Sequence, residues 1–180
     1  MCYLDFNTVA GSDKFGNIFV LRLPENANDQ VENPTGSRIL WDQGLLNGAP
    51  TKVELLTHYH LGELPTSITV AQLIPGGRKV IIVATVTGGI YALLPLEVKD
   101  DVDFFTHLEM FMRQETSGLC KREHLSYRSY FVPVKNTVDG DMCERFGALP
   151  YVKQMEFAET QQRSPAEVLK KLEDMRNSLM

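Results

Sequence analysis

Two histidines are the first side chains in this sequence that could do chemistry. His58 and His60 are separated by one residue in an expected strand, so both point to the same face. Two imidazoles on one face could begin a zinc site, which takes roughly three or four ligands. No third ligand lies at a recognisable spacing, so the alternative is a packed or solvated strand surface. The sequence therefore predicts no bound metal here.

A second candidate is the pair Asp139 and Asp141, which flank a glycine. Two carboxylates could hold Mg²⁺, because hard cations prefer oxygen ligands. Aspartates before an apolar helical stretch also cap helices, since their oxygens accept bonds from free backbone N–H groups. Asp141 precedes Met142 and Phe146, so capping is the favoured interpretation.

No set of catalytic residues is complete. Ser126 and Ser129 lie close to His124 in the sequence, as a nucleophile and base could, but no acidic partner is specified. Cys120 precedes two basic residues that could lower its pKa, yet nothing around it forms a catalytic set. We expect an unreactive thiol, no enzymatic activity and no cofactor.

An aromatic and basic group offers a binding function instead. Its members are Tyr127, Arg128, Tyr130, Phe131 and Lys135. Such rings could stack on single-stranded RNA. They could equally pack a helical part against strands, with Arg128 in a structural ion pair. Packing is favoured because the local charge is too small to drive phosphate binding, and it predicts that the three rings are largely buried.

The elements that position these residues change type along the chain. Residues 1–98 read as β, with strands expected at 8–12, 17–23, 53–61, 67–74, 79–87 and 89–96. Residues 13–16 form a turn, and 24–38 read as an exposed loop because they are rich in Asn, Asp, Pro and Gly. The last four strands suit an antiparallel meander, the repeating unit of a propeller blade, so about two blades are expected.

Residues 99–180 switch to a helical period and predict a small α-helical domain. One apolar face consists of Phe104, Leu108, Phe111 and Met112. Asp100 or Asp101 could cap this helix. A final helix begins with the capping box Ser164 to Glu167, with Pro165 at its first position. Its apolar face consists of Val168, Leu172, Met175 and Leu179. Residues 149–162 have no convincing period and are expected to be a loose connection.

The composition is that of a soluble globular chain, with 43% hydrophobic and 23% charged residues. A net charge of -5 argues against a protein that coats nucleic acid. Three widely spaced cysteines form no disulfide framework, which favours a reducing compartment. The longest apolar stretch, at 80–86, is too short to span a membrane. Since blades bury their faces against neighbouring blades, the chain is expected to be part of a larger assembly.

Several motifs together resemble one scaffold family. They are DKFGN at 13–17, LIPGG at 73–77, TGGI at 87–90 and HLSYRSYFVPVKNTVDGDMCERF at 124–146. They are similar to the C-terminal segment of the large β-propeller family that holds the damaged-DNA-binding protein large subunit, the cleavage and polyadenylation specificity factor large subunit and splicing factor 3b subunit 3. The PVKN run at 133–136 favours the splicing member.

The resemblance implies three seven-bladed propellers followed by a small helical domain. Residues 1–98 would end the last propeller and residues 99–180 would be the helical domain. The implied role is that of a non-catalytic nuclear scaffold, which supports U2 snRNP assembly and branch-site recognition in pre-mRNA splicing. Implied partners are the large helical-repeat subunit and small companion subunits of splicing factor 3b, with U2 snRNA and pre-mRNA associated indirectly. The alternative is an adaptor of a cullin-type ubiquitin ligase in DNA-damage recognition.

The same signature supplies the structural or interface candidates. They are Tyr127, Arg128, Tyr130, Phe131, Asp139 and Asp141.

Overall fold

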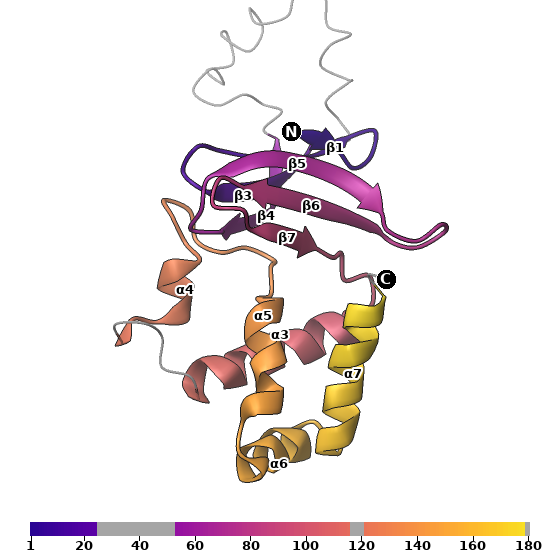
Figure 1. Cartoon of the computed structure of the whole chain (residues 1–180), viewed down its shortest axis with the longest axis vertical. Helices are drawn as coiled ribbons and strands as arrows, with labels where there is room; N and C mark the ends of the chain where they lie inside the picture. Colours follow the sequence, from indigo (N-terminus) through magenta and orange to yellow (C-terminus); the bar gives the residue numbers. More distant parts are fainter. Residues whose placement is uncertain (25–52, 116–120, 179–180) are drawn as a thin grey trace, which may run out of the picture.

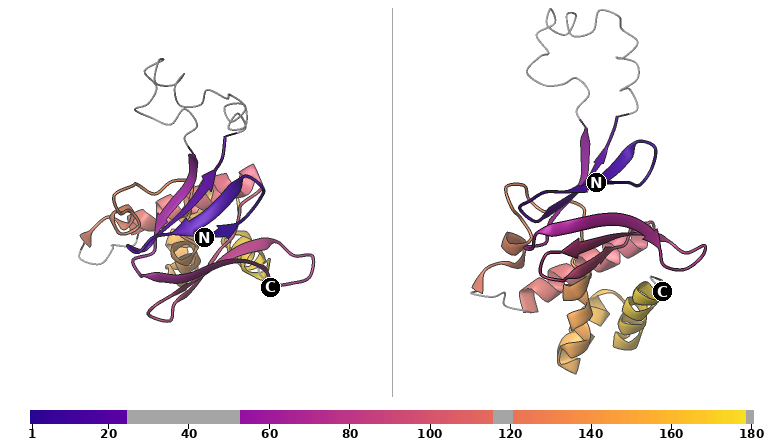
Figure 2. Two further views of the ribbon diagram at one scale, coloured as in Figure 1. Left: turned by 90° about the horizontal axis from the view of Figure 1, so that it is seen from above. Right: turned by 45° about the horizontal axis from the view of Figure 1, so that its top comes forward.

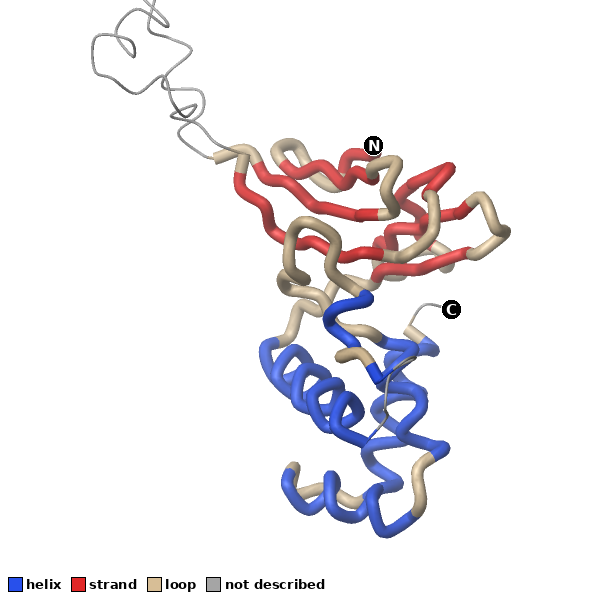
Figure 3. The backbone as a smooth tube through the Cα atoms, turned by 90° about the vertical axis from the view of Figure 1, so that its left-hand side faces the viewer, coloured by secondary structure: helices blue, strands red, loops and turns tan. Residues whose placement is uncertain are grey.

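The computed structural model describes residues 1–24, 53–115 and 121–178. Strands gather at one end of the molecule and helices at the other, as Figures 1 and 3 show. The sequence-based expectation of a mainly β N-terminal half followed by a helical part is therefore confirmed. The expected loop at 24–38 and Leu179 lie largely or wholly outside the described residues.

Two antiparallel sheets make up the β half. The first has the order β1 (Cys2–Tyr3), β2 (Thr8–Ser12), β3 (Asn17–Arg22) and β4 (Glu54–His60). The second has the order β5 (Pro65–Gln72), β6 (Lys79–Thr85) and β7 (Ile90–Leu93). The strand positions agree with the sequence-based expectation to within a few residues, except that β1 was not foreseen.

The expected grouping of the last four strands into one meander was wrong. β4 pairs with β3, with Tyr59 opposite Ile18, and the chain then passes to the second sheet. An alternating pattern shows which face of a strand is buried, but it names no partner strand. The pairing of β3 with β4 joins segments that are far apart in sequence, so only the folded chain reveals it.

The two sheets lie over each other and share one apolar core (Figure 2). Its buried members are Ala10, Ile18, Val20, Tyr59, Leu61, Ile81 and Val83. Residues of both sheets therefore contribute to the same cluster. Burial of this apolar surface is the main force that holds the sheets together.

The helical part has its own core. Its elements are α3 (Lys99–Glu115), α4 (His124–Tyr127), α5 (Gly140–Glu144), the 3₁₀ helix η3 (Arg145–Ala148), α6 (Tyr151–Thr160) and α7 (Pro165–Asn177). The buried members are Phe104, Phe105, Leu108, Met112, Met142, Cys143, Phe146, Phe157, Ala158, Val168 and Leu172. Among the described residues, no helix is long and apolar enough to cross a bilayer.

The structure corrects the predicted start of the first long helix and confirms the predicted start of the last one. α3 begins at Lys99, so Asp100 and Asp101 lie inside its first turn, and their prediction as caps was wrong. They still favour the helix there, because the N-terminal end of the helix dipole attracts negative charge. The capping box of α7 is confirmed: the Glu167 amide donates to Ser164 Oγ at 3.3 Å, and the Ser164 amide donates to Glu167 Oε2 at 2.7 Å.

The expectation of a loose connection at 149–162 was also wrong, because α6 forms there. Phe157 and Ala158 of this helix are buried, whereas Tyr151 and Val152 are exposed. The buried face also holds Gln154, whose Nε2 donates to the carbonyl of Leu149 at 2.9 Å. A polar residue inside and apolar residues outside conceal the helical period in the sequence.

Candidate interaction site

Asp139 lies where the strands meet the helices. It is only 4% exposed, and it caps α5 because its Oδ1 accepts a hydrogen bond from the Met142 amide at 3.2 Å. The capping interpretation is thus confirmed, but for Asp139 rather than Asp141. Asp141 is exposed within the first turn, since the helix begins at Gly140.

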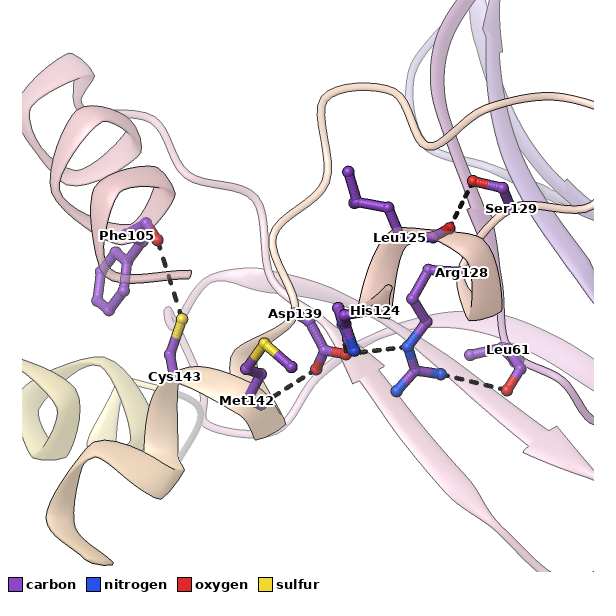
Figure 4. A network of polar contacts seen from close by, with 9 residues as sticks. All are labelled: Leu61, Phe105, His124, Leu125, Arg128, Ser129, Asp139, Met142 and Cys143. Atoms are coloured by element: carbon purple, nitrogen blue, oxygen red, sulfur yellow. Dashed lines mark hydrogen bonds and ion pairs between the residues drawn. The ribbon is translucent and has the colours of Figure 1, made fainter. Parts of the chain in front are cut away.

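Arg128 and His124 converge on the other oxygen of this carboxylate (Figure 4). Arg128 Nε donates to Asp139 Oδ2 at 2.9 Å, and Arg128 Nη1 donates to the Leu61 carbonyl at 3.3 Å. His124 Nε2 also lies 2.9 Å from Asp139 Oδ2, although this close contact is poorly aligned for a hydrogen bond. The predicted structural ion pair of Arg128 is therefore present.

Two more buried groups complete this arrangement. The Tyr59 hydroxyl of β4 hydrogen-bonds Asp139, and the Arg128 guanidinium lies 5.1 Å from the centre of the Tyr59 ring. Glu109 of α3 is 7% exposed and accepts a hydrogen bond from the Asp139 amide. We call Tyr59, Glu109, His124, Arg128 and Asp139 the Asp139 cluster. It joins one strand to three helical elements.

Electrostatics favour one protonation state of the cluster. Burial opposes ionisation of Asp139, but Arg128, the Met142 amide and His124 together hold its pKa below the usual value. Burial lowers the pKa of His124, against the pull of Asp139. Burial, with Asp139 nearby, raises the pKa of Tyr59. At neutral pH the cluster therefore contains an ionised Asp139–Arg128 pair beside a neutral His124 and a neutral Tyr59.

Next to the cluster, residues 128–136 run along the edge of β4. The His58 amide donates to the Lys135 carbonyl at 3.1 Å, and the Lys135 amide donates back to the His58 carbonyl at 3.0 Å. The His60 amide donates to the Arg128 carbonyl at 3.0 Å. Val134 packs against the core of the sheets, although it belongs to the helical half by sequence. This segment therefore fastens the two halves together.

The predicted chemical candidates have structural roles in this fold. His58 and His60 lie on β4 as expected; His58 is buried, and His60 Nδ1 lies 3.0 Å from Asn17 Oδ1. The described ranges contain no group of three His, Cys, Asp or Glu that could hold a metal. The hydroxyls of Ser126 and Ser129 donate to backbone carbonyls, at 2.7 and 2.8 Å respectively. Cys120 lies outside the described residues.

The expected burial of the aromatic group was wrong in part. Tyr127 is half-buried, Tyr130 is 38% exposed and Phe131 is 86% exposed. Phe131 adopts a positive φ of 62° in a tight turn closed by the bridge between Tyr130 and Val132. This turn directs the Phe131 ring away from the core. Neither residue type nor spacing predicts such a conformation for phenylalanine, which disfavours it.

Sequence reasoning missed Tyr59, Glu109 and Phe15. Tyr59 lies between the two histidines, where it reads as an ordinary strand residue. Glu109 did carry a signal: it lies four residues after Phe105 and three before Met112, so helical spacing places it on the buried face. The sequence shows Phe15 only as part of a turn, yet its ring contacts those of Tyr130 and Phe131.

Taken together, these features define a protein in which packed strands and helices are joined by a buried charged cluster. The charged residues of the site contact one another and backbone atoms. Residues 1–148 match the model of the CPSF A subunit region, and the chain belongs to this family.

Several known proteins are similar to nearly the whole chain. Spliceosome-associated protein 130 A of Arabidopsis thaliana is 50% identical over 99% of the chain, and Splicing factor 3B subunit 3 of Danio rerio is 52% identical over 97%. Pre-mRNA-splicing factor RSE1 of Mycosarcoma maydis is 44% identical over 96%. The resemblance to the splicing member of the family is confirmed. The chain spans only 14–15% of the length of these relatives.

Proposed function

We propose that this chain is a non-catalytic scaffold segment of a splicing factor 3B-type subunit. It supports assembly of the U2 snRNP and recognition of the branch site during pre-mRNA splicing, and it acts in the nucleus. The observation that carries this proposal is identity of 50–52% with two splicing-associated proteins over 97–99% of the chain. The matched region covers both the strands and the helices.

The geometry supports a scaffold role. In the described residues, the buried charged groups pair with each other and with backbone atoms, so they stabilise the fold rather than activate a substrate. Many large apolar side chains are nevertheless exposed, among them Phe6, Ile90, Tyr151 and Val152. Single exposed apolar side chains are common on any protein, whereas contiguous ones, such as the rings of Phe15, Tyr130 and Phe131, mark surfaces that meet other proteins.

We further propose two structural units. Residues 1–98 form the end of a β-propeller, and residues 99–180 form the helical domain that follows it. Two separate apolar clusters support this division. Leu96 packs with the helical core and Val134 with the strand core, so the units are tied at their junction. In this arrangement, further blades cover the exposed faces of the sheets.

The proposed partners are the large helical-repeat subunit and the small companion subunits of splicing factor 3B. Contact with U2 snRNA and pre-mRNA is indirect in this proposal, which agrees with a net charge of -5.

Affinity purification of the full protein from its own cells tests this function. We expect the helical-repeat subunit and the U2 snRNA to be recovered in amounts comparable to the tagged protein. A matched purification after nuclease treatment separates protein contacts from RNA-bridged ones, and we expect the helical-repeat subunit to remain. Recovery of a cullin scaffold in place of splicing factor 3B subunits would contradict the proposal and support the ubiquitin-ligase alternative.

A further inference from the structure

Three aromatic rings form an exposed cluster beside the Asp139 cluster. The Tyr130 ring centre lies 5.7 Å from that of Phe15 and 4.4 Å from that of Phe131. Phe15 and Phe131 are 6.2 Å apart, in an edge-to-face arrangement. Their exposed fractions are 49% for Phe15, 38% for Tyr130 and 86% for Phe131. We call these three residues the aromatic knuckle.

The knuckle rests on a rigid base. The Tyr130 ring stacks on His60 at 5.2 Å with an interplanar angle of 21°. His60 in turn contacts Asn17, whose side-chain amide donates to Asp13 Oδ2 at 2.7 Å. Asp13 Oδ1 accepts from the Phe15 amide at 2.8 Å, which fixes the turn that carries Phe15. The rings are therefore held in place before any partner arrives, which lowers the entropy cost of binding.

The backbone at the tip of the knuckle is strained. Phe131 has a φ of 62°, a region that a bulky side chain rarely adopts. Hydrogen bonds to β4 hold the chain on both sides of the tip, through Arg128 and Lys135. Strain that persists at an exposed position is typical of functional sites, and phenylalanine is usually buried. The fold thus presents the Phe131 ring to the outside at a cost in stability.

We propose that the aromatic knuckle is a docking surface for a protein partner that offers an apolar pocket to Phe131. The Lys14 ammonium lies 5.1 Å from the Phe15 ring centre, at the rim of the knuckle. Charge complementarity therefore requires a carboxylate beside that pocket. Exposed aromatic anchors with a charged rim are the usual composition of protein–protein hot spots.

The nearby charges favour a protein over RNA as the partner. RNA stacking platforms need several free cations to neutralise phosphates. Of the two cations in the aromatic and basic group, Arg128 is bound to Asp139 and the Leu61 carbonyl. Lys135 Nζ donates to the Leu55 carbonyl at 2.6 Å. Among the described members of these segments, Lys14 contacts the knuckle while Arg128 and Lys135 are engaged elsewhere, which suits a single carboxylate better than a phosphate chain.

This inference rests on the proposed function, and its test uses the purified helical-repeat subunit of splicing factor 3B as the probe. Phe131→Ala and Phe131→Gly are made in the full protein, and Tyr151→Ala is the control, because Tyr151 is an exposed aromatic on α6. We expect both Phe131 variants to weaken binding at least about tenfold. Neither should melt at a lower temperature, and Phe131→Gly should melt at an equal or higher temperature because glycine relieves the positive φ. The control is expected to bind as the unmodified protein does. Lys14→Glu should slow association, because it repels the expected carboxylate.

The outcomes separate this surface from the function on which it rests. If the unmodified protein and the Phe131 variants bind the probe equally, the docking surface is refuted while the proposed function stands. If none of them binds, both are refuted. A lower melting temperature in both Phe131 variants would show that the rest of the polypeptide covers the ring, and this too refutes the proposal. If the Phe131 variants bind the probe normally but lose binding to an oligouridine strand, the knuckle is assigned to RNA. If they bind the probe normally but no longer form a homodimer, it is assigned to a second copy of the chain.

Discussion

The Asp139 cluster makes one strong prediction about stability, for the substitution Asp139→Asn. This change removes the negative charge but keeps an oxygen that can accept the Met142 amide and preserve the cap of α5. Arg128 then keeps its positive charge with no carboxylate partner, although its side chain is only 21% exposed. We therefore expect substantial destabilisation without loss of the helix start.

The magnitude follows from the burial of the pair. Removing one partner of a buried ion pair costs about 3–5 kcal/mol, because the remaining charge stays desolvated. Water can partly reach Arg128, so we expect the lower end, about 3 kcal/mol of unfolding free energy. For a chain of this size each kcal/mol shifts the melting temperature by about 2–4 °C. Asp139→Asn should thus melt about 6–12 °C lower.

Thermal and urea unfolding at neutral pH, followed by circular dichroism, measure this effect. Asp141→Asn is the matched control, because Asp141 is exposed two residues further along the same helix. Its expected cost is below about 1 kcal/mol, because Asp141 interacts with the helix dipole and, without a direct ion pair, with Arg128. The double variant Arg128→Met with Asp139→Asn should lose less than the sum of the single changes. Our reasoning is refuted if Asp139→Asn and Asp141→Asn have the same stability.

Three further predictions concern other buried or capping groups. Burial lowers the pKa of His58, His60 and His124, so the unfolded chain binds protons before the folded chain does as the pH falls. The melting temperature should therefore decrease below about pH 6.5. A melting temperature that stays constant down to about pH 5 would contradict this. Gln154→Leu should cost about 1–3 kcal/mol in urea unfolding, because the Leu149 carbonyl loses the donor that Gln154 supplies, whereas the Phe146 carbonyl keeps the Leu149 amide. Ser164→Ala should cost about 1 kcal/mol, measured by the same assay, whereas Ser164→Asp should retain stability.

The strands, turns and capped helix were predictable because their signals are local. The turn at 13–16 has Asp13 as an acceptor for two backbone amides, which its sequence suggests. α7 begins where Ser164 and Glu167 form a capping box, a pattern of only four residues. α6 was missed because Gln154 occupies a buried position, and a buried glutamine makes sense only once the carbonyls that it contacts are placed.

The site likewise combines residues that the sequence could identify with partners that only the fold reveals. Arg128 and Asp139 were recognisable as candidates, but their partners Tyr59 and Glu109 come from distant parts of the chain. No spacing rule connects a strand residue at 59 with a helix residue at 109 and a cap at 139. Likewise, the exposure of Phe131 depends on a positive φ that the surrounding hydrogen bonds impose.

By itself the sequence determined the change from strands to helices, the capping motifs and the family, because alternation, capping and motif order are encoded by neighbouring residues. Only the tertiary structure decided that β4 joins the first sheet, that Asp139 collects a strand and three helical elements, and that Phe131 faces outward. The physical reason is that burial, ion pairing and backbone strain depend on which distant segments meet, and these contacts exist only in the folded chain.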